Sequence, residues 1–256
     1  MATEHTQASA VDVAAYILQE TGPIESMKLQ KLVYYAQAWS LAWCGSPLFL
    51  DRIEAWKHGP VVRTVWAAHE RGRGSSPLGC HDLHGGYADR VSQEQRRCIS
   101  IVLGMYSSMT SPALRAKTHE EDPWIIARGS LREEEPSNEE ILREVIRNYY
   151  KERSMIELGA AYNRALVSVH DVAYALHLDI FDALSLIEKH GYCRPIESIE
   201  LSSEERAAQL KRIRENRIRR GGKVTVSESE ISSSVIASQR LEGVDARPWV
   251  TNANKA

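Results

Sequence analysis

Three titratable side chains stand close together in the stretch EAWKHGPVV, which runs from residue 54 to residue 62. Glu54, Lys57 and His58 supply a carboxylate, an amine and an imidazole, which are groups that transfer protons in general acid–base catalysis. Such catalysis also needs a nucleophile or a second titrating group beside the imidazole, with a matched pKa. The neighbouring sequence offers no such partner at a recognisable spacing. We therefore predict that this stretch is scaffold and that the chain has no catalytic residue.

Cys80, His81 and His84 form a loose group of metal-ligand residue types in a glycine-rich segment. Structural zinc sites usually show two clusters of paired ligands, about two to four residues apart within each pair. The second cluster is missing here. The sequence also contains none of the patterns GxxxxGK[ST], GxGxxG after a strand, HExxH or GxSxG. We expect no metal and no cofactor.

The bulk composition is ordinary for a soluble globular protein, with 43% hydrophobic and 26% charged residues. A net charge of -2 argues against a protein that coats nucleic acid with its whole surface. We expect no signal peptide and no membrane span, because no basic segment precedes an apolar run and no apolar run is long enough. A cytoplasmic location is expected. The cysteines are scattered without a CxxC pair, so a disulfide framework is not expected: Cys44, Cys80, Cys98 and Cys193.

The periodicity of apolar residues predicts a mainly α fold with at most a small β element. A helix is expected over 9–19, ended by Gly22-Pro23, and a central core helix from Met27 to Gly45. One or two short strands fit within 47–56, and a third helix is expected to open at Gly59-Pro60. A loop follows over 71–89. Further helical patterns cover 92–109, 111–129 and 137–153, the last with Ser137 as its cap.

Three blocks of the sequence, in this order, resemble the Panacea domain, also called the SocA-like antitoxin domain. The resemblance covers roughly residues 10 to 150. It implies a mostly helical antitoxin of the kind found in bacteria and phages, which neutralises a toxin encoded beside it, usually by direct binding. One branch of the family is thought to deliver its toxin to a protease instead, and the family is not known as an enzyme. The blocks are Lys28-Leu29-Gln30-Lys31-Leu32-x-Tyr34-Tyr35, Ala55-Trp56-x-x-Gly59-Pro60-Val61 and His119-x-x-Asp122-Pro123-Trp124.

The resemblance implies two sets of residues with different roles. One set is expected to determine the fold: Trp56, Gly59, Pro60, His119, Pro123 and Trp124. The other set is expected to bind the partner: Lys28, Gln30, Lys31 and Tyr34. Lys28, Lys31 and Tyr34 follow at three-residue steps and can share a helix face, which either contacts a partner or forms the solvated edge of a core helix.

Within the region 153–222, the segment 168–192 resembles the helix-turn-helix core of small antitoxins, with a short helix, a turn around His177–Asp179 and a second helix ending at Gly191. Asp179 and Asp182 at the start of that second helix would repel phosphates, which favours protein contacts over DNA reading. A basic helix follows, which could track the phosphates of operator DNA, dock on an acidic toxin or be a solvated face. Its candidate contact residues are Arg212, Arg214, Arg217, Arg219 and Arg220.

The segment SQRLEG near the C-terminus fits the pattern Ser/Thr-x-x-x-Glu-Gly/Asn. This pattern resembles the inhibitory helix of antitoxins that restrain Fic-type AMP-transferases. By that resemblance Glu242 would pair with an arginine of the toxin, and Ser238 and Gly243 would complete the motif. The chain has no Fic catalytic motif, so it would be the inhibitor.

We therefore expect a cytoplasmic type II antitoxin, with an association with phage defence. Its expected parts are a Panacea domain (1–152), a helix-turn-helix-like module with the basic helix (153–222) and a flexible tail (223–256). The expected partner is a cognate toxin encoded nearby. The competing roles are a transcriptional regulator that binds operator DNA and an adaptor that delivers the toxin to a cellular protease. The identity of the toxin and the oligomeric state stay open.

Overall fold

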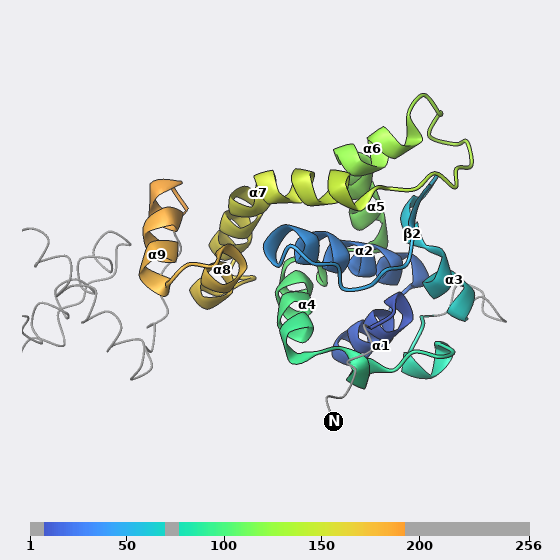
Figure 1. Cartoon of the computed structure of the whole chain (residues 1–256), viewed down its shortest axis with the longest axis horizontal. Helices are drawn as coiled ribbons and strands as arrows, with labels where there is room; N and C mark the ends of the chain where they lie inside the picture. The colour runs from blue at the N-terminus through green and yellow to red at the C-terminus, as the bar shows by residue number, and fades with distance from the viewer. Residues whose placement is uncertain (1–7, 70–76, 193–256) are drawn as a thin grey trace, which may run out of the picture. The chain divides into compact units, whose positions relative to one another are not determined.

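The structure is a computed structural model, and it describes residues 8–69 and 77–192. These residues form a mainly helical fold with one small antiparallel sheet, as predicted (Figure 1). None of the helices in the described part of the chain has the length and apolar character that crossing a membrane requires. The elements are α1 (Ala10–Thr21), α2 (Ser26–Trp43), β1 (Ile53–Trp56), β2 (Gly59–Val62), α3 (Arg63–His69), η1 (Cys80–Asp82), η2 (Ala88–Arg90), α4 (Gln93–Tyr106), α5 (Ser111–His119), α6 (Asp122–Arg128), α7 (Arg143–Asn163), α8 (Val169–Leu176) and α9 (Ile180–Lys189).

Helix α2 is the centre of the core, as its apolar circumference predicts. It packs against α1, α4, α5, α7 and β2, and Figure 1 shows these elements around it. Its largest side chains, Trp39, Tyr34 and Tyr35, are fully buried. A helix that is covered on every side can bury polar residues only where other elements offer them hydrogen-bond partners. The polar residues of α2 therefore identify the contacts that position the rest of the fold.

Serine caps begin three helices within residues 8–69 and 77–192: Ser9 for α1, Ser92 for α4 and Ser168 for α8. The side chain of Ser9 accepts a hydrogen bond from the backbone N–H of Asp12, and the Asp12 carboxylate accepts one from the backbone N–H of Ser9. Ser92 and Gln95 make the same reciprocal pair at the start of α4. Each pair satisfies backbone donors that the first helical turn leaves unpaired.

The prediction that Gly59-Pro60 opens a helix is wrong. Both residues belong to β2, which pairs antiparallel with β1 so that Trp56 faces Gly59 and Ala55 faces Pro60. Gly59 has φ = +96°, a conformation outside the helical region that favours glycine. The short β1–β2 turn consists of Lys57 and the following residue, and α3 begins only after the strand.

The prediction that Ser137 caps a helix is also wrong, because α7 begins at Arg143. The preceding segment runs along β1 instead. The backbone N–H of Ala55 donates to the carbonyl of Glu139 at 2.8 Å, and that of Ile141 donates to the carbonyl of Ile53 at 2.9 Å. These bonds occupy the edge of β1 that β2 leaves unpaired, so the segment gains partners that one more helical turn would not supply.

Helix α7 continues through residue 152, where a domain boundary is predicted, and that boundary stays a prediction. The short helix, turn and second helix predicted after it are present as α8 and α9. His177 ends α8 in a left-handed conformation, with φ = +53°. The Asp179 carboxylate caps α9 by accepting from the N–H groups of Phe181 and Asp182. The acidic start of α9 thus has a structural role.

Candidate functional site

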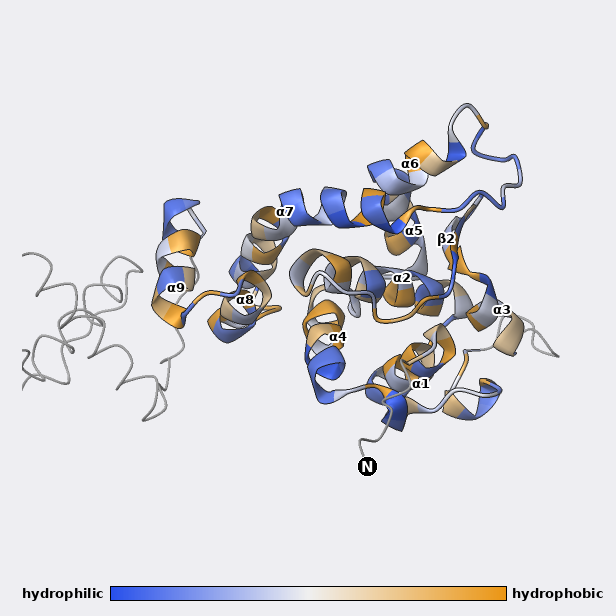
Figure 2. Cartoon of the chain, in the orientation of Figure 1, coloured by the Kyte–Doolittle hydropathy of each residue, from blue (hydrophilic) through white to orange (hydrophobic). Residues whose placement is uncertain are grey.

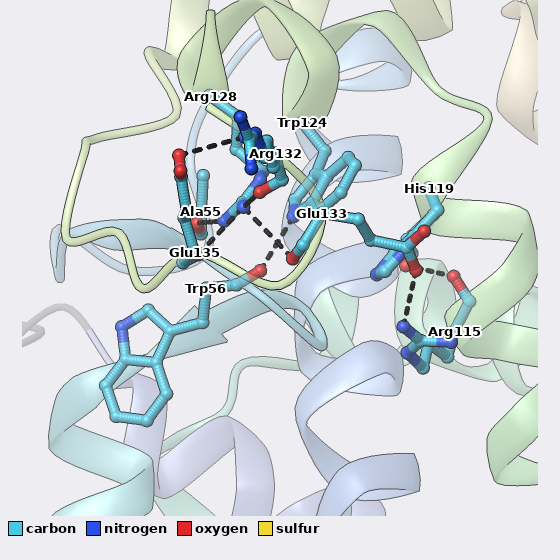
Figure 3. Close-up of polar contacts among 10 residues, drawn as sticks. Ala55, Trp56, Arg115, His119, Trp124, Arg128, Arg132, Glu133 and Glu135 are labelled. Atoms are coloured by element: carbon cyan, nitrogen blue, oxygen red, sulfur yellow. Dashed lines mark hydrogen bonds and ion pairs between the residues drawn. The ribbon is translucent and has the colours of Figure 1, made fainter. Parts of the chain in front are cut away.

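The second and third sequence blocks meet where β1 ends and α6 begins (Figure 3). The indole N–H of Trp124 donates to the backbone carbonyl of Trp56 at 2.9 Å. The imidazole ring of His119 stacks on the Trp124 indole, with ring centroids 4.0 Å apart and an interplanar angle of 13°. Trp124 is buried between these contacts. The contacts join the end of α5, the start of α6 and the hairpin.

Arg128 at the end of α6 holds the following loop in place. Its guanidinium lies 4.9 Å from the centre of the Trp124 ring and donates to the carbonyl of Ala55 at 3.2 Å. Its Nη2 atom donates to the carbonyls of Glu133 at 3.1 Å and Glu135 at 2.8 Å, and also to that of residue 132 (Figure 3). The side chain is buried, and these four hydrogen-bond partners are all backbone carbonyls. The planar guanidinium, with five N–H donors, suits this arrangement.

The first and second sequence blocks meet at Lys31. Its ammonium group is buried and donates to the carbonyl of Pro60 at 2.9 Å. A Cβ atom on Gly59 would lie 2.7 Å from Nζ and Cε of Lys31 and from Oγ1 of Thr118, so only glycine fits there. Burial, followed by the charge of Arg115, lowers the pKa of Lys31 to about 7. The fold therefore keeps an amine in the core with a carbonyl as its hydrogen-bond acceptor.

A buried carboxylate contacts α2 at Tyr35, one helical turn after Lys31. Glu121, between α5 and α6, accepts hydrogen bonds from the hydroxyl of Tyr35 at 3.1 Å and from that of Tyr150 at 2.6 Å. Lys117 lies 4.0 Å away, at the limit of an ion pair. Burial raises the pKa of Glu121 to about 7, although the tyrosine hydrogen bonds and Lys117 act in the opposite direction. Glu121 thus links α2 to α7 from the start of α6.

Glu133 in the loop after α6 faces two basic side chains (Figure 3). Its Oε1 atom lies 2.6 Å from Nη2 of Arg115 and 3.3 Å from Nδ1 of His119. Burial, followed by the charge of Arg115, lowers the pKa of His119, and Glu133 opposes this effect. Nε2 of His119 and Nε of Arg115 are buried without a hydrogen-bond partner. The Glu133 side chain is 56% exposed, whereas those of Arg115 and His119 are 32% and 12% exposed.

A pocket of about 170 Å³ opens beside this cluster. Basic, acidic, aromatic and apolar side chains all contribute to it, a mixture that is typical of ligand-binding pockets. The lining residues are His119, Trp124, Ile125, Arg128, Gly129, Leu131 and Glu133.

The three titratable residues of the opening stretch are not brought together in one site. The Glu54 carboxylate is buried and accepts a hydrogen bond from the indole N–H of Trp56 at 2.7 Å. Lys57 and His58 are exposed on the hairpin turn. Within residues 8–69 and 77–192, no three His, Cys, Asp or Glu side chains are grouped as metal ligands.

The predicted partner-binding residues of α2 lie mostly inside the fold. Gln30 exchanges hydrogen bonds with the backbone of Val62, accepting at 2.9 Å and donating at 3.4 Å. Lys31 holds the hairpin, and Tyr34 is fully buried beside Tyr150. Lys28 alone of the four predicted residues is partly exposed. Contact of these residues with a partner stays a prediction.

Two predicted groups lie outside the described residues, and their roles stay predictions. They are Arg212, Arg214, Arg217, Arg219 and Arg220 of the basic segment, and Ser238, Glu242 and Gly243 of the SQRLEG motif. Within the described part, sequence reasoning missed Arg128 and Glu133. The spacing of Arg128, one helical turn after Trp124, was an available signal, because residues four apart share a helix face.

Residues 29–125 match the family model described as "Antitoxin SocA-like, Panacea domain". The match contains the Lys31–Pro60 contact and the Trp124–Trp56 contact, and it confirms the resemblance inferred from the three sequence blocks. Comparison with curated proteins and with solved structures gave no match. The chain thus contains a SocA-like Panacea domain, a domain of antitoxins that are generally not enzymes, which implies an antitoxin role and a cognate toxin as partner.

Proposed function

We propose that this protein is the antitoxin of a type II toxin–antitoxin system and neutralises a toxin encoded beside it by direct binding. The match of residues 29–125 to an antitoxin domain carries this proposal. It acts in the cytoplasm and takes part in phage defence. Neutralisation by binding needs no cofactor and no catalytic group, because a bound antitoxin blocks the toxin's active site or its substrate access.

The described surface contains an apolar face that suits such a partner. We define the α6 face as Ile125, Ile126 and Leu131, which are 43%, 61% and 38% exposed. Figure 2 shows the hydrophobic end of α6 next to the loop that Arg128 holds. Exposed apolar residues with a polar rim are typical of protein–protein interaction sites.

The chemistry around the α6 face favours an acidic partner segment. Ile125 and Leu131 line the pocket together with His119 and Arg128, and Arg115 lies beside His119. Glu133, a carboxylate of this same chain, meets Arg115 and His119 there. We infer that a toxin carboxylate displaces Glu133 while toxin apolar side chains cover the α6 face.

The test compares the growth of cells that express the neighbouring toxin gene, with and without this protein. We expect the full chain to restore growth and Ile126→Asp to lose at least about tenfold in affinity for the toxin, because an aspartate cannot be desolvated at an apolar contact. Ile156→Asp is the matched control, since Ile156 on α7 is 58% exposed and receives the same change. Failure of the neighbouring gene to inhibit growth contradicts the antitoxin role.

Two further variants locate the neutralising segment. A chain truncated after Gly222 and a full chain with Glu242→Ala test the Fic-type hypothesis, which predicts loss of protection in both. Toxin abundance distinguishes binding from adaptor function, because an adaptor lowers the amount of toxin in a protease-proficient cell and a stoichiometric inhibitor does not. Protection that persists in both variants places neutralisation in residues 1–222.

A further inference from the structure

Two cysteines line the same cavity near the end of α2. Cys44 follows the last residue of α2, and Cys98 lies in α4, which packs against α2. A hydrogen bond between the two thiols lowers the pKa of Cys44 to about 7, against the opposing effect of burial. The same contact, together with burial, raises the pKa of Cys98. The pKa of Cys44 therefore lies below that of Cys98.

The pair is accessible from a pocket. Cys44 and Cys98 both line a cavity of about 320 Å³, together with Ser40, Leu48 and Gln95. Cys44 is partly exposed, whereas Cys98 is buried. A small oxidant therefore reaches Cys44 first. The reactive form of cysteine is the thiolate, and a resolving thiol beside it is typical of redox-sensing cysteines.

Helix α8 completes the surroundings of Cys44. The hydroxyl of Tyr174 hydrogen-bonds the Cys44 sulfur, and the charge of His177 also favours its thiolate. The His177 ring lies 2.5 Å from the carbonyl of Trp43, and the guanidinium of Arg97 lies 4.3 Å from the centre of the Tyr174 ring. Contacts to the end of α2 and to α4 thus hold α8 next to the thiol pair.

We propose that Cys44 and Cys98 form a redox-modification site that a peroxide converts into an intramolecular disulfide, and that this disulfide loosens the docking of α8. The Cys44 thiolate attacks one peroxide oxygen, and the O–O bond breaks to give a sulfenic acid and hydroxide. The Cys98 thiol then attacks the Cys44 sulfur, and the S–O bond breaks with release of water. The oxygen of the sulfenic acid leaves as water with the proton of Cys98. The hydroxide from the first step takes up the proton that Cys44 lost and becomes a second water.

The loosening follows from the loss of the Cys44 thiolate. A disulfide sulfur carries no charge, so it accepts a hydrogen bond from Tyr174 more weakly and gains nothing from His177. The sulfurs must also move from hydrogen-bond contact to a bond of about 2.05 Å, which draws the turn after α2 toward α4. That turn carries the carbonyl of Trp43 that His177 contacts. Reduction by a dithiol restores the contacts.

The test treats the reduced full-length chain with one equivalent of hydrogen peroxide, followed by alkylation and peptide mapping. We expect the number of alkylatable thiols to fall from four to two, with a peptide pair linked through Cys44 and Cys98. Cys80→Ser is the matched control, because Cys80 is exposed and does not line this cavity, and it should leave this link unchanged. Cys98→Ser should instead leave a Cys44 sulfenic acid that dimedone traps.

Hydrogen exchange of the oxidised and reduced wild-type chain tests the effect on α8. We expect faster exchange of the amides of residues 169–176 in the oxidised form, and recovery after reduction. A chain that keeps four thiols, or that links Cys44 or Cys98 to another cysteine, overturns the site. A Cys44–Cys98 disulfide with unchanged exchange in α8 overturns the coupling. These measurements need no toxin, so the result is independent of the antitoxin proposal.

Discussion

The ammonium group of Lys31 lies against Gly59 and donates a hydrogen bond to the carbonyl of Pro60 at 2.9 Å. This hydrogen bond joins the central helix to the hairpin across 29 positions of the sequence, from residue 31 to residue 60. It explains why a lysine in the middle of α2 and a glycine–proline pair in β2 occur in the same domain. The lysine needs a carbonyl acceptor in the core, and the glycine leaves space for it.

The first prediction concerns Gly59→Ala. The added methyl group would lie 2.7 Å from Lys31 and Thr118, and alanine is strained at φ = +96°. We expect the free energy of unfolding to fall by about 2–4 kcal/mol, since the strain and the steric conflict add. Urea unfolding of the variant and the wild type measures this difference.

Gly45→Ala is the control for that experiment. Gly45 also has a positive φ, +69°, but an added Cβ would meet nothing within 4 Å. Its expected cost is roughly 1 kcal/mol, the backbone contribution alone. Equal costs at the two positions would show that the contact with Lys31 does not restrict residue 59.

The second prediction concerns the pH dependence of stability through Glu121. Its folded-state pKa of about 7 lies above the ordinary 4.5, so the folded state binds the proton more tightly than the unfolded state. The resulting stabilisation is fully present below about pH 4.5 and is lost as the pH rises through about 7. We expect Glu121→Gln to remove this contribution, which amounts to about 3 kcal/mol.

Chemical unfolding of both proteins at a series of pH values between 4.5 and 8 measures the effect. The comparison must be between variants, because the lowered pKa of Lys31 makes stability rise with pH above about 7. Glu120→Gln is the control: the adjacent carboxylate is exposed, and its removal should preserve the wild-type pH profile. Parallel profiles for wild type and Glu121→Gln would contradict the assigned role of Glu121.

Helices with local signals are the part of the fold that the sequence predicts well. Helical patterns are predicted to begin at residues 9 and 92, and in the structure Ser9 and Ser92 cap the helices found there. The apolar circumference of α2 likewise predicts its central position. These features depend on residues within a few positions of one another, so tertiary contacts do not need to be known.

The hairpin and the loop after α6 depend on distant partners, and the sequence does not predict them. Gly-Pro is suited both to a helix start and to a strand with a positive φ, and in the structure Gly59 and Pro60 pair with β1 and contact Lys31. Ser137 followed by acidic residues is typical of a helix start, but the backbone of this segment forms hydrogen bonds with the edge of β1 instead. The sequence does not distinguish the buried Arg128 from an exposed arginine, because the four carbonyls that accept its hydrogen bonds are known only from the structure.

The third prediction concerns Arg128→Lys, which keeps the charge and removes the planar fork. A lysine ammonium group can serve at most three of the four carbonyls, and its position on a flexible stem differs from that of the guanidinium. We expect the free energy of unfolding to fall by about 2–4 kcal/mol, because buried carbonyls lose their donors. Hydrogen exchange in residues 129–135 should increase more than in α4, since the loop loses its main attachment.

Arg132→Lys provides the control within the same loop. Arg132 is exposed and contributes only its backbone to the site, so its replacement should leave both stability and loop exchange unchanged. Arg128→Lys should also weaken toxin binding, because the loop carries Leu131 of the α6 face and Glu133 of the basic cluster. If Arg128→Lys loosens the loop and toxin affinity stays at the wild-type value, the loop does not form part of the toxin contact, and the contact must lie elsewhere on the chain.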